Sequence, residues 1–172
     1  MKGKVALVTG GASGIGRATA VRLAEVGFRV VVTDVDPAGQ QVVAAIAEAV
    51  FLEHDVTDES SWKRAIQTVL DTHDRLDVLV NNAGISYVRP VTDTPLADWR
   101  ALMAVNLDGV FLGTKHGVQA MRRHGEGGSI VNVSSAAGLT GSPLSSAYCA
   151  SKGGVVKDHA NSPLVIARIP HL

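Results

Sequence analysis

A glycine-rich turn between a short apolar run and a helical segment most limits the folds open to this chain. Val5–Val8 predicts a buried parallel strand, and residues 9–16 read TGGASGIG before the helix-forming residues 17–24. Glycine permits backbone conformations and a close approach that a Cβ would block, and the first turn of a helix presents unpaired N–H groups. The pattern therefore indicates either a diphosphate-binding turn or, more simply, a tight turn before a helix.

A second apolar run ends in an acid. Val30–Thr33 is followed directly by Asp34. At the end of the second strand of a βαβ unit, a carboxylate can accept hydrogen bonds from an adenosine ribose and repels a 2′-phosphate. Together with the glycine turn, Asp34 predicts NAD in preference to NADP. Without that turn, a solvated acid at a strand end is the simpler interpretation.

The rest of the chain alternates strand and helix signals with short connections, which is typical of an α/β fold with a doubly wound parallel sheet, Rossmann-like. Pro37 opens a helix predicted to reach Ala49, and Thr57 or Asp58 can cap the next helix. A long helical stretch begins near Pro95. Further strands are expected at residues 50–52, 76–80 and 129–133.

Three side chains near the end of the chain form a candidate chemical site. Tyr148 and Lys152 are four residues apart on a predicted helix, and Ser135 follows the fifth predicted strand. One helical turn places the phenol and the ammonium on the same face, where the cation favours phenolate and makes Tyr148 a usable acid/base. A hydroxyl such as that of Ser135 can hydrogen-bond an oxygen on which charge develops. Taken alone, the pair is more simply a solvated helix face.

Composition agrees with a single domain over residues 1–172, since 46% of the residues are hydrophobic and 19% are charged. Sixteen basic residues balance sixteen acidic ones without a basic stripe, which argues against nucleic acid as a partner. No apolar run is long enough for a membrane span, and the first strand begins too early for a signal peptide. We expect a cytoplasmic protein.

Cys149 is the only cysteine, so neither an intrachain disulfide nor a zinc cluster is expected, and no metal site is predicted. Its place beside Tyr148 suggests a small packing residue, with a reactive thiol as the alternative.

In this order the motifs resemble those of the short-chain dehydrogenase/reductase family, over about residues 1–155. Thr9, Gly10, Gly14 and Gly16 match its TGxxxGxG turn, and residues 81–84 match its NNAG motif. The family's catalytic tetrad is matched by Asn106, Ser135, Tyr148 and Lys152. The resemblance implies that the cofactor is bound by Gly10, Ser13, Gly14, Ile15, Gly16, Asp34, Asp55, Val56, Asn82, Ala83, Gly84, Tyr148 and Lys152.

The resemblance also implies an activity: an NAD(H)-dependent oxidoreductase that interconverts a secondary alcohol and a ketone by hydride transfer. Lys152 would hold the nicotinamide ribose, and Ser135 would position the substrate oxygen. Ser135 is preferred to Ser134 because its distance from Tyr148 fits the family pattern. Asn106 would sit in mid-helix, where Asn is a poor helix former, and would either hold a water that relays protons from Lys152 or act as an internal capping amide.

The C-terminal region departs from the family pattern. Relatives continue with a sixth strand, a Pro-Gly turn, a substrate lid and a last strand, whereas residues 157–172 form a divergent tail. We therefore expect the later strands and the lid to be missing. Leu164–Ile169 could form a short sixth strand, or Ala167–Pro170 could match a segment that follows the lid. An active enzyme and a dinucleotide-binding remnant or interaction module without turnover both stay open.

The substrate is expected to be a small alcohol or carbonyl compound. Ile85–Val88 and Ala136–Pro143 are the segments expected to touch it, and their small and apolar residues favour a neutral, partly apolar secondary alcohol. The family resemblance also makes a homo-oligomer possible.

Overall fold

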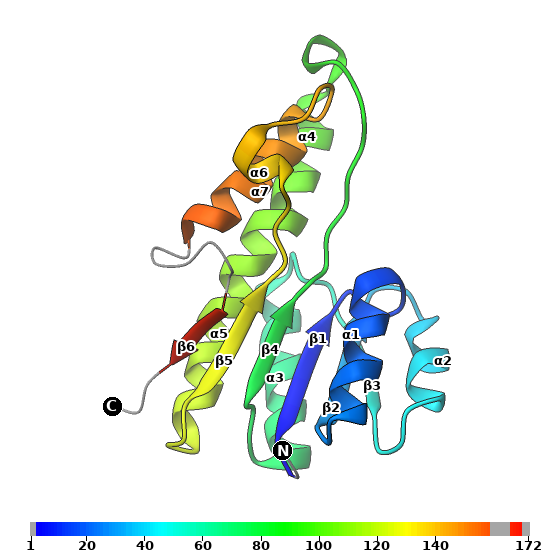
Figure 1. Ribbon diagram of the computed structural model, residues 1–172, viewed down its shortest axis with the longest axis vertical. Coiled ribbons are helices and arrows are strands. Elements are labelled where there is room, and N and C mark those ends of the chain that lie inside the picture. The colour runs from blue at the N-terminus through cyan, green and yellow to red at the C-terminus, as the bar shows by residue number, and fades with distance from the viewer. Residues whose placement is uncertain (1–2, 159–165, 170–172) are drawn as a thin grey trace.

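The computed structural model describes residues 3–158 and 166–169. A six-stranded sheet in the order β3-β2-β1-β4-β5-β6 forms its centre, and helices cover both faces (Figure 1). Strands β1 to β5 pair in parallel, which confirms the predicted doubly wound α/β fold. The strands are β1 (Val5–Thr9), β2 (Arg29–Asp34), β3 (Val50–Glu53), β4 (Val78–Asn81), β5 (Gly128–Asn132) and β6 (Ile166–Ile169).

Helices α1 and α2 cover one face of the sheet, while α3 and α5 cover the other (Figure 1). The long helical stretch predicted from Pro95 is continuous, but it contains a π-helical turn, labelled η2, between α4 and α5. The helices are α1 (Gly14–Glu25), α2 (Gly39–Ala44), α3 (Glu59–His73), η1 (Val91–Asp93), α4 (Leu96–Met103), η2 (Ala104–Asp108), α5 (Gly109–Arg123), α6 (Ala137–Thr140) and α7 (Ser146–Asp158).

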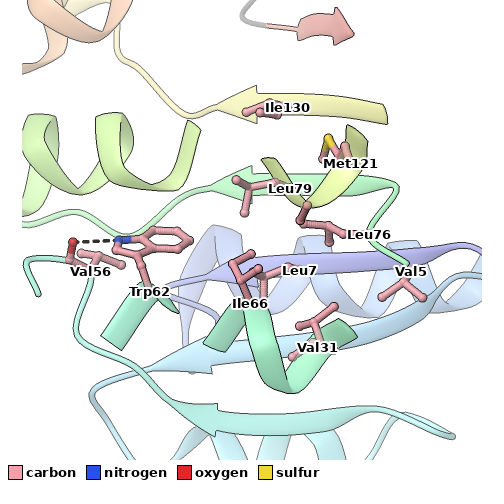
Figure 2. Packing of buried hydrophobic residues seen from close by; sticks show 12 residues of the cluster. Val5, Leu7, Val31, Val56, Trp62, Ile66, Leu76, Leu79, Met121 and Ile130 are labelled. Atoms are coloured by element: carbon pink, nitrogen blue, oxygen red, sulfur yellow. Dashed lines mark hydrogen bonds between the residues drawn. The ribbon is translucent and has the colours of Figure 1, made fainter. Parts of the chain in front are cut away.

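Each face of the sheet buries its own hydrophobic core. Leu7 and Leu79 belong to the core under α3 and α5, whereas Val8 and Val80 belong to the core under α1 and α2. Figure 2 shows the first of these cores around Trp62. Because successive side chains of a strand point to opposite faces, burial on both faces requires the continuous apolar runs that predicted these strands.

The strand order reverses beside β1, because β2 pairs with one edge of β1 and β4 pairs with the other. The turn after β1 and the segment after β4 therefore leave the sheet as neighbours at its carboxyl edge. Open α/β sheets bind their ligands at such a reversal. The fold thus brings the glycine turn and the NNAG motif to the same place.

The sixth strand differs in direction from the other five. Strand β6 lies within the predicted range, but it runs antiparallel to β5, with Ile166 opposite Val131 and Ile169 opposite Gly128. To pair in parallel, the chain would first have to return to the amino end of β5. Strand β6 instead begins beside the carboxyl end of β5 and runs towards its amino end. Residues 159–165 and 170–172 of the divergent tail lie outside the described residues. The expected lack of a last strand and a lid stays a prediction.

Helix α2 is shorter than predicted. The sequence favours a helix to Ala49, but α2 ends at Ala44. The N–H groups of Ala45 and Ile46 bond three residues back, to Val42 and Val43, and so tighten the chain into a turn. The buried side chain of Ile46 and the start of β3 a few residues later require that turn.

Candidate active site

A cavity of about 580 Å³ lies at the carboxyl edge of the sheet and reaches from the glycine turn to α7. All the residues predicted to bind the cofactor line it except Gly16. Its wall is made by Gly10, Ser13, Gly14, Ile15, Asp34, Val35, His54, Asp55, Val56, Asn82, Ala83, Gly84, Ile85, Ser86, Val105, Val133, Ser134, Tyr148 and Lys152.

The glycine turn needs its glycines for two different reasons. Gly10 and Gly14 have positive φ angles of 63° and 51°, which a side chain disfavours. A Cβ on Gly10 would also lie 2.7 Å from the Cα of Ala83, whereas a Cβ on Gly14 would meet no protein atom within 4 Å. Gly16 has a packing role instead, since a Cβ there would collide with the carbonyl oxygen of Gly10.

Side-chain hydrogen bonds join the glycine turn to the NNAG motif. Thr9 Oγ1 accepts from the backbone N–H groups of Asn82 (3.0 Å) and Ala83 (3.1 Å). In return, the Asn82 side-chain amide donates to the carbonyl oxygens of Thr9 (2.9 Å) and Gly10 (3.0 Å). These contacts hold together two segments more than seventy residues apart in the chain.

Hydrogen bonds to the backbone also hold the side chain of Asp34, at the end of β2. One of its carboxylate oxygens accepts from the N–H of Ala12 at 2.9 Å, and the other accepts from the N–H of Asp36 at 3.1 Å. Each oxygen of a carboxylate has a further lone pair for a ligand. The charge of Asp34 is therefore fixed in place beside the glycine turn and lines the cavity.

The turn after β3 forms the next part of the wall. Asp55 and Val56 line the cavity, and Asp55 Oδ1 accepts from the N–H and the hydroxyl of Thr57. The buried indole of Trp62 donates from Nε1 to the carbonyl oxygen of Val56 at 3.0 Å (Figure 2). Through this hydrogen bond, helix α3 fixes the position of the turn. Asp58, rather than Thr57, caps α3, because its carboxylate accepts from the N–H groups two and three residues ahead.

His54 was not predicted as a site residue, yet it lines the cavity together with Asp34 and Asp55. Its ring packs edge-on against Trp62, and its Nδ1 lies 3.0 Å from Thr33 Oγ1. The side chain is 2% exposed, and burial lowers the pKa of His54 to about 4. The imidazole is therefore neutral at neutral pH. Its position two residues after the strand predicted at residues 50–52 was the only sequence signal for it.

Tyr148 and Lys152 come together as predicted on α7. The Lys152 ammonium lies 5.9 Å from the centre of the Tyr148 ring and donates to the carbonyl oxygen of Val133 at 2.7 Å. Only 4% of Lys152 is exposed, and burial lowers its pKa from the usual value. The cation therefore sits in a poorly solvated place beside the phenol, where its electrostatic influence is strongest.

Asn106 lies in the π-helical turn η2, where it is fully buried. Its Oδ1 accepts from the N–H of Ile85 at 2.8 Å, and its Nδ2 donates to the carbonyl oxygen of Ile85 at 2.9 Å. The mid-helix amide thus has backbone partners and also coincides with a helix irregularity. A Cβ on Gly84 would lie 3.4 Å from Asn106 Oδ1 and 3.6 Å from Lys152 Nζ, so both polar groups are close to the space that a side chain at this position would enter.

The two adjacent serines after β5 have different hydrogen bonds. Ser134 lines the cavity, but its hydroxyl donates to the carbonyl oxygen of Lys152 at 2.9 Å. Ser135 Oγ instead accepts from the N–H of Ala137 at 3.2 Å, which leaves its O–H free to donate. Ser135 is not itself part of the cavity wall. Its free donor is nevertheless what the predicted role requires.

The remaining features predicted from the sequence concern the single cysteine, metal ligands and membrane-spanning helices. Cys149 Sγ accepts from the N–H of Ser142 at 3.1 Å, as a packing residue near the site can. In the described part of the chain, no three His, Cys, Asp or Glu side chains are grouped so as to hold a metal ion. The helices within residues 3–158 include none that is long and apolar enough to cross a membrane.

The chain is similar to known proteins over most of its length. The family model for short chain dehydrogenases matches residues 4–159. An NADP-dependent (R)-specific alcohol dehydrogenase of Lentilactobacillus kefiri is 43% identical over 159 residues, which cover 90% of this chain and 63% of that protein. A cyclopentanol dehydrogenase of Comamonas testosteroni is 46% identical over 88% of this chain and 62% of its own length.

A 3-oxoacyl-[acyl-carrier-protein] reductase of Synechocystis is 40% identical over 89% of this chain and 64% of its own length. The chain therefore spans somewhat less than two thirds of the curated relatives that it matches. Because the family model covers nearly all of the chain, this protein belongs to the short chain dehydrogenase family.

Proposed function

We propose that the protein binds NAD(H) in this cavity and interconverts a secondary alcohol and a ketone. The observation that carries the proposal is that one cavity joins the glycine turn to Tyr148 and Lys152. A bound nicotinamide would supply the hydride acceptor or donor. The names of two relatives, an alcohol dehydrogenase and a cyclopentanol dehydrogenase, support this class of chemistry.

The residues at one end of the cavity fit a dinucleotide. Gly14 places no side chain at the start of α1, whose first N–H groups suit a pyrophosphate. Asp34 would accept hydrogen bonds from the adenosine ribose. Asp55 and Val56 would meet the adenine, on the turn that Trp62 holds in place.

The charge of Asp34 supports NAD over NADP. Its two oxygens are anchored by backbone N–H groups, so the carboxylate cannot easily turn away from a 2′-phosphate. A fixed negative charge at this point repels that phosphate. The NADP-dependent relative shows that family membership does not decide the choice, so the proposal rests on Asp34 itself.

Tyr148 would take the proton of the alcohol during oxidation and return it to the carbonyl oxygen during reduction. Lys152 would hold the nicotinamide ribose and would stabilise the negative charge that the phenol oxygen gains during proton transfer. Ser135 has an O–H free to donate to the substrate oxygen as charge develops there.

We also propose the proton relay through Asn106. The absence of a side chain at Gly84 leaves space between Asn106 Oδ1 and Lys152 Nζ, and a water there would reach both. Asn106 is held rigidly by Ile85, so it would present a fixed acceptor to that water.

The substrate would be neutral and partly apolar. Residues 85–88 and 134–151 contain no charged side chain. Ile85 lies in the cavity wall, and Leu139 and Leu144 expose apolar side chains on the segments after β5. A charged substrate would find no counter-ion on these walls. The cytoplasmic location and the homo-oligomer expected from the sequence stay predictions.

The test combines binding and turnover. Titration with NADH, followed by its fluorescence, reports binding, and NADH absorbance with a panel of cyclic and open-chain ketones reports oxidation. Tyr148→Phe should keep NADH affinity and reduce turnover by about 10² to 10⁴. Tyr87→Phe makes the same change at the other tyrosine, which lies in a segment proposed to touch the substrate, so it should alter KM for the ketone but keep kcat within about threefold of the parent.

Full activity in Tyr148→Phe would refute the assignment of the acid/base. Binding of NADH by the parent without oxidation by any ketone would instead favour a dinucleotide-binding module without turnover.

A further inference from the structure

Two serines outside the predicted tetrad contact the backbone of its two residues on α7. Ser151 donates its hydroxyl to the carbonyl oxygen of Tyr148 at 2.8 Å. Ser134 donates its hydroxyl to the carbonyl oxygen of Lys152 at 2.9 Å. Each serine therefore holds a main-chain atom of a different member of the pair.

The Ser151 contact extends beyond its own helix. Ser151 is fully buried, and its Oγ also accepts from Asn106 Nδ2 at 3.2 Å. Asn106 binds both backbone groups of Ile85. A continuous chain of hydrogen bonds thus runs from the segment after β4, through the π-helical turn, to the backbone of Tyr148.

The Ser134 contact ties α7 to the end of β5. Lys152 is held there twice, because its ammonium donates to Val133 while its carbonyl oxygen accepts from Ser134. Gly138 allows this close approach of the two backbones, since a Cβ there would lie 2.6 Å from the carbonyl carbon of Lys152. The backbone of Lys152 therefore lies directly against the segment after β5.

We infer that Ser134 and Ser151 are positioning residues that fix Tyr148 and Lys152 relative to the ends of β5 and β4. This inference rests on the proposed function for its catalytic consequence. Reacting groups must be held closely, because a displacement of about 1 Å can reduce the rate about 10²-fold. Two hydroxyl anchors at successive turns prevent α7 from rotating or sliding along the sheet edge. They also explain why two serines follow β5, one for the helix and one for the substrate.

The experiment compares Ser134→Ala and Ser151→Ala with Ser146→Ala, which makes the same change on the same helix at its first residue. Hydrogen–deuterium exchange measures α7 directly and does not depend on turnover. Both test variants should exchange roughly fivefold faster in residues 146–158, with no change in β1 or α3, because each loses one hydrogen bond. Ser146→Ala should exchange like the parent.

Steady-state kinetics then test the consequence. With a ketone that the parent reduces, kcat should fall about 10- to 100-fold in both test variants. KM for the ketone and the dissociation constant for NADH should change less than about threefold, because neither hydroxyl is assigned to a ligand. Ser134→Thr keeps the hydroxyl on a partly exposed residue and should restore kcat to within about threefold of the parent.

Unchanged exchange in α7 for both alanine variants would overturn the inference, whatever the activity. Faster exchange spread over the whole sheet would also overturn it, because the serines would then only stabilise the fold. If the parent oxidises no NADH, the proposed function fails, while the localised exchange still decides whether the serines hold α7.

Discussion

At the scale of single residues, the site contains two buried nitrogen bases whose pKa values are lowered by the fold. Lys152 and His54 are 4% and 2% exposed, and burial lowers the pKa of each. For a base, a lowered pKa means that the unfolded chain binds the proton more tightly than the folded one. The proton on each side chain therefore works against folding, and the two residues can be tested separately.

Lys152→Met should separate function from stability. Removing the ammonium removes the unfavourable free energy of burying a charge, but it also leaves the carbonyl oxygen of Val133 without this donor. We expect the free energy of unfolding at pH 7 to change by less than about 1 kcal/mol. NADH affinity and hydride transfer should both fall, since the ammonium is proposed to bind the ribose and to favour the phenolate. Urea unfolding and NADH titration measure the two effects, and a strongly destabilised variant would contradict this account.

His54 should make stability depend on pH between its unfolded and folded pKa values. Because the pKa falls from 6.5 to about 4, its contribution is complete above pH 6.5 and is lost as the pH falls towards 4. Between pH 7 and pH 5, this one residue should lower the free energy of unfolding by about 2 kcal/mol. Urea unfolding at both pH values measures the loss. His54→Phe should remove that part of the pH dependence, and an unchanged slope would refute it.

Asp34→Arg should change the choice of cofactor. The substitution replaces a fixed carboxylate with a guanidinium that attracts a 2′-phosphate. We expect NADH affinity to fall and NADPH affinity to rise, each by about tenfold or more. Fluorescence titrations with both dinucleotides give the ratio. A ratio equal to that of the parent would show that Asp34 does not contact the ribose.

At the scale of elements, two local irregularities shape the site. One is the glycine turn between β1 and α1, and the other is the π-helical turn between α4 and α5. The turn uses Gly10 and Gly14 at positive φ, and the π turn places Asn106 against Ile85. The sequence indicated the turn because glycine permits positive φ angles, and it placed Asn106 in mid-helix, where Asn is a poor helix former. Helix α2 was predicted too long, since residues 45–49 favour a helix locally while the sheet requires a turn there.

Gly14→Val tests the turn as a phosphate site. A Cβ at Gly14 meets no protein atom within 4 Å, so the expected cost of the change is backbone strain at φ 51°. The strain should cost about 1 to 3 kcal/mol, and the new side chain should abolish NADH binding. Gly27→Val is the matched control, because Gly27 also has a positive φ and open space but lies outside the cavity wall. It should lose similar stability and retain NADH binding, as urea unfolding and NADH titration will show.

At the scale of the whole molecule, the strand order decides where the chemistry lies. Strand β1 sits between β2 and β4, so the ends of these three strands meet at one edge of the sheet. Strand β5 adds Ser134 and Ser135 beside them, and α7 brings Tyr148 and Lys152 across the same edge. Seven separate stretches of the chain therefore contribute to one cavity, and they lie within residues 10–15, 34–35, 54–56, 82–86, 105, 133–134 and 148–152.

The sequence by itself determined the parallel strands, the glycine turn and the Tyr148–Lys152 pair. Apolar runs, glycine positions and a spacing of four residues are local patterns, and local patterns follow directly from backbone geometry. The tertiary structure alone decided the direction of β6, the packing role of Gly16, the burial of His54 and the partners of Ser134. These features depend on contacts between segments that are distant in the chain. The periodicity of a single segment does not determine which other segment will pack against it.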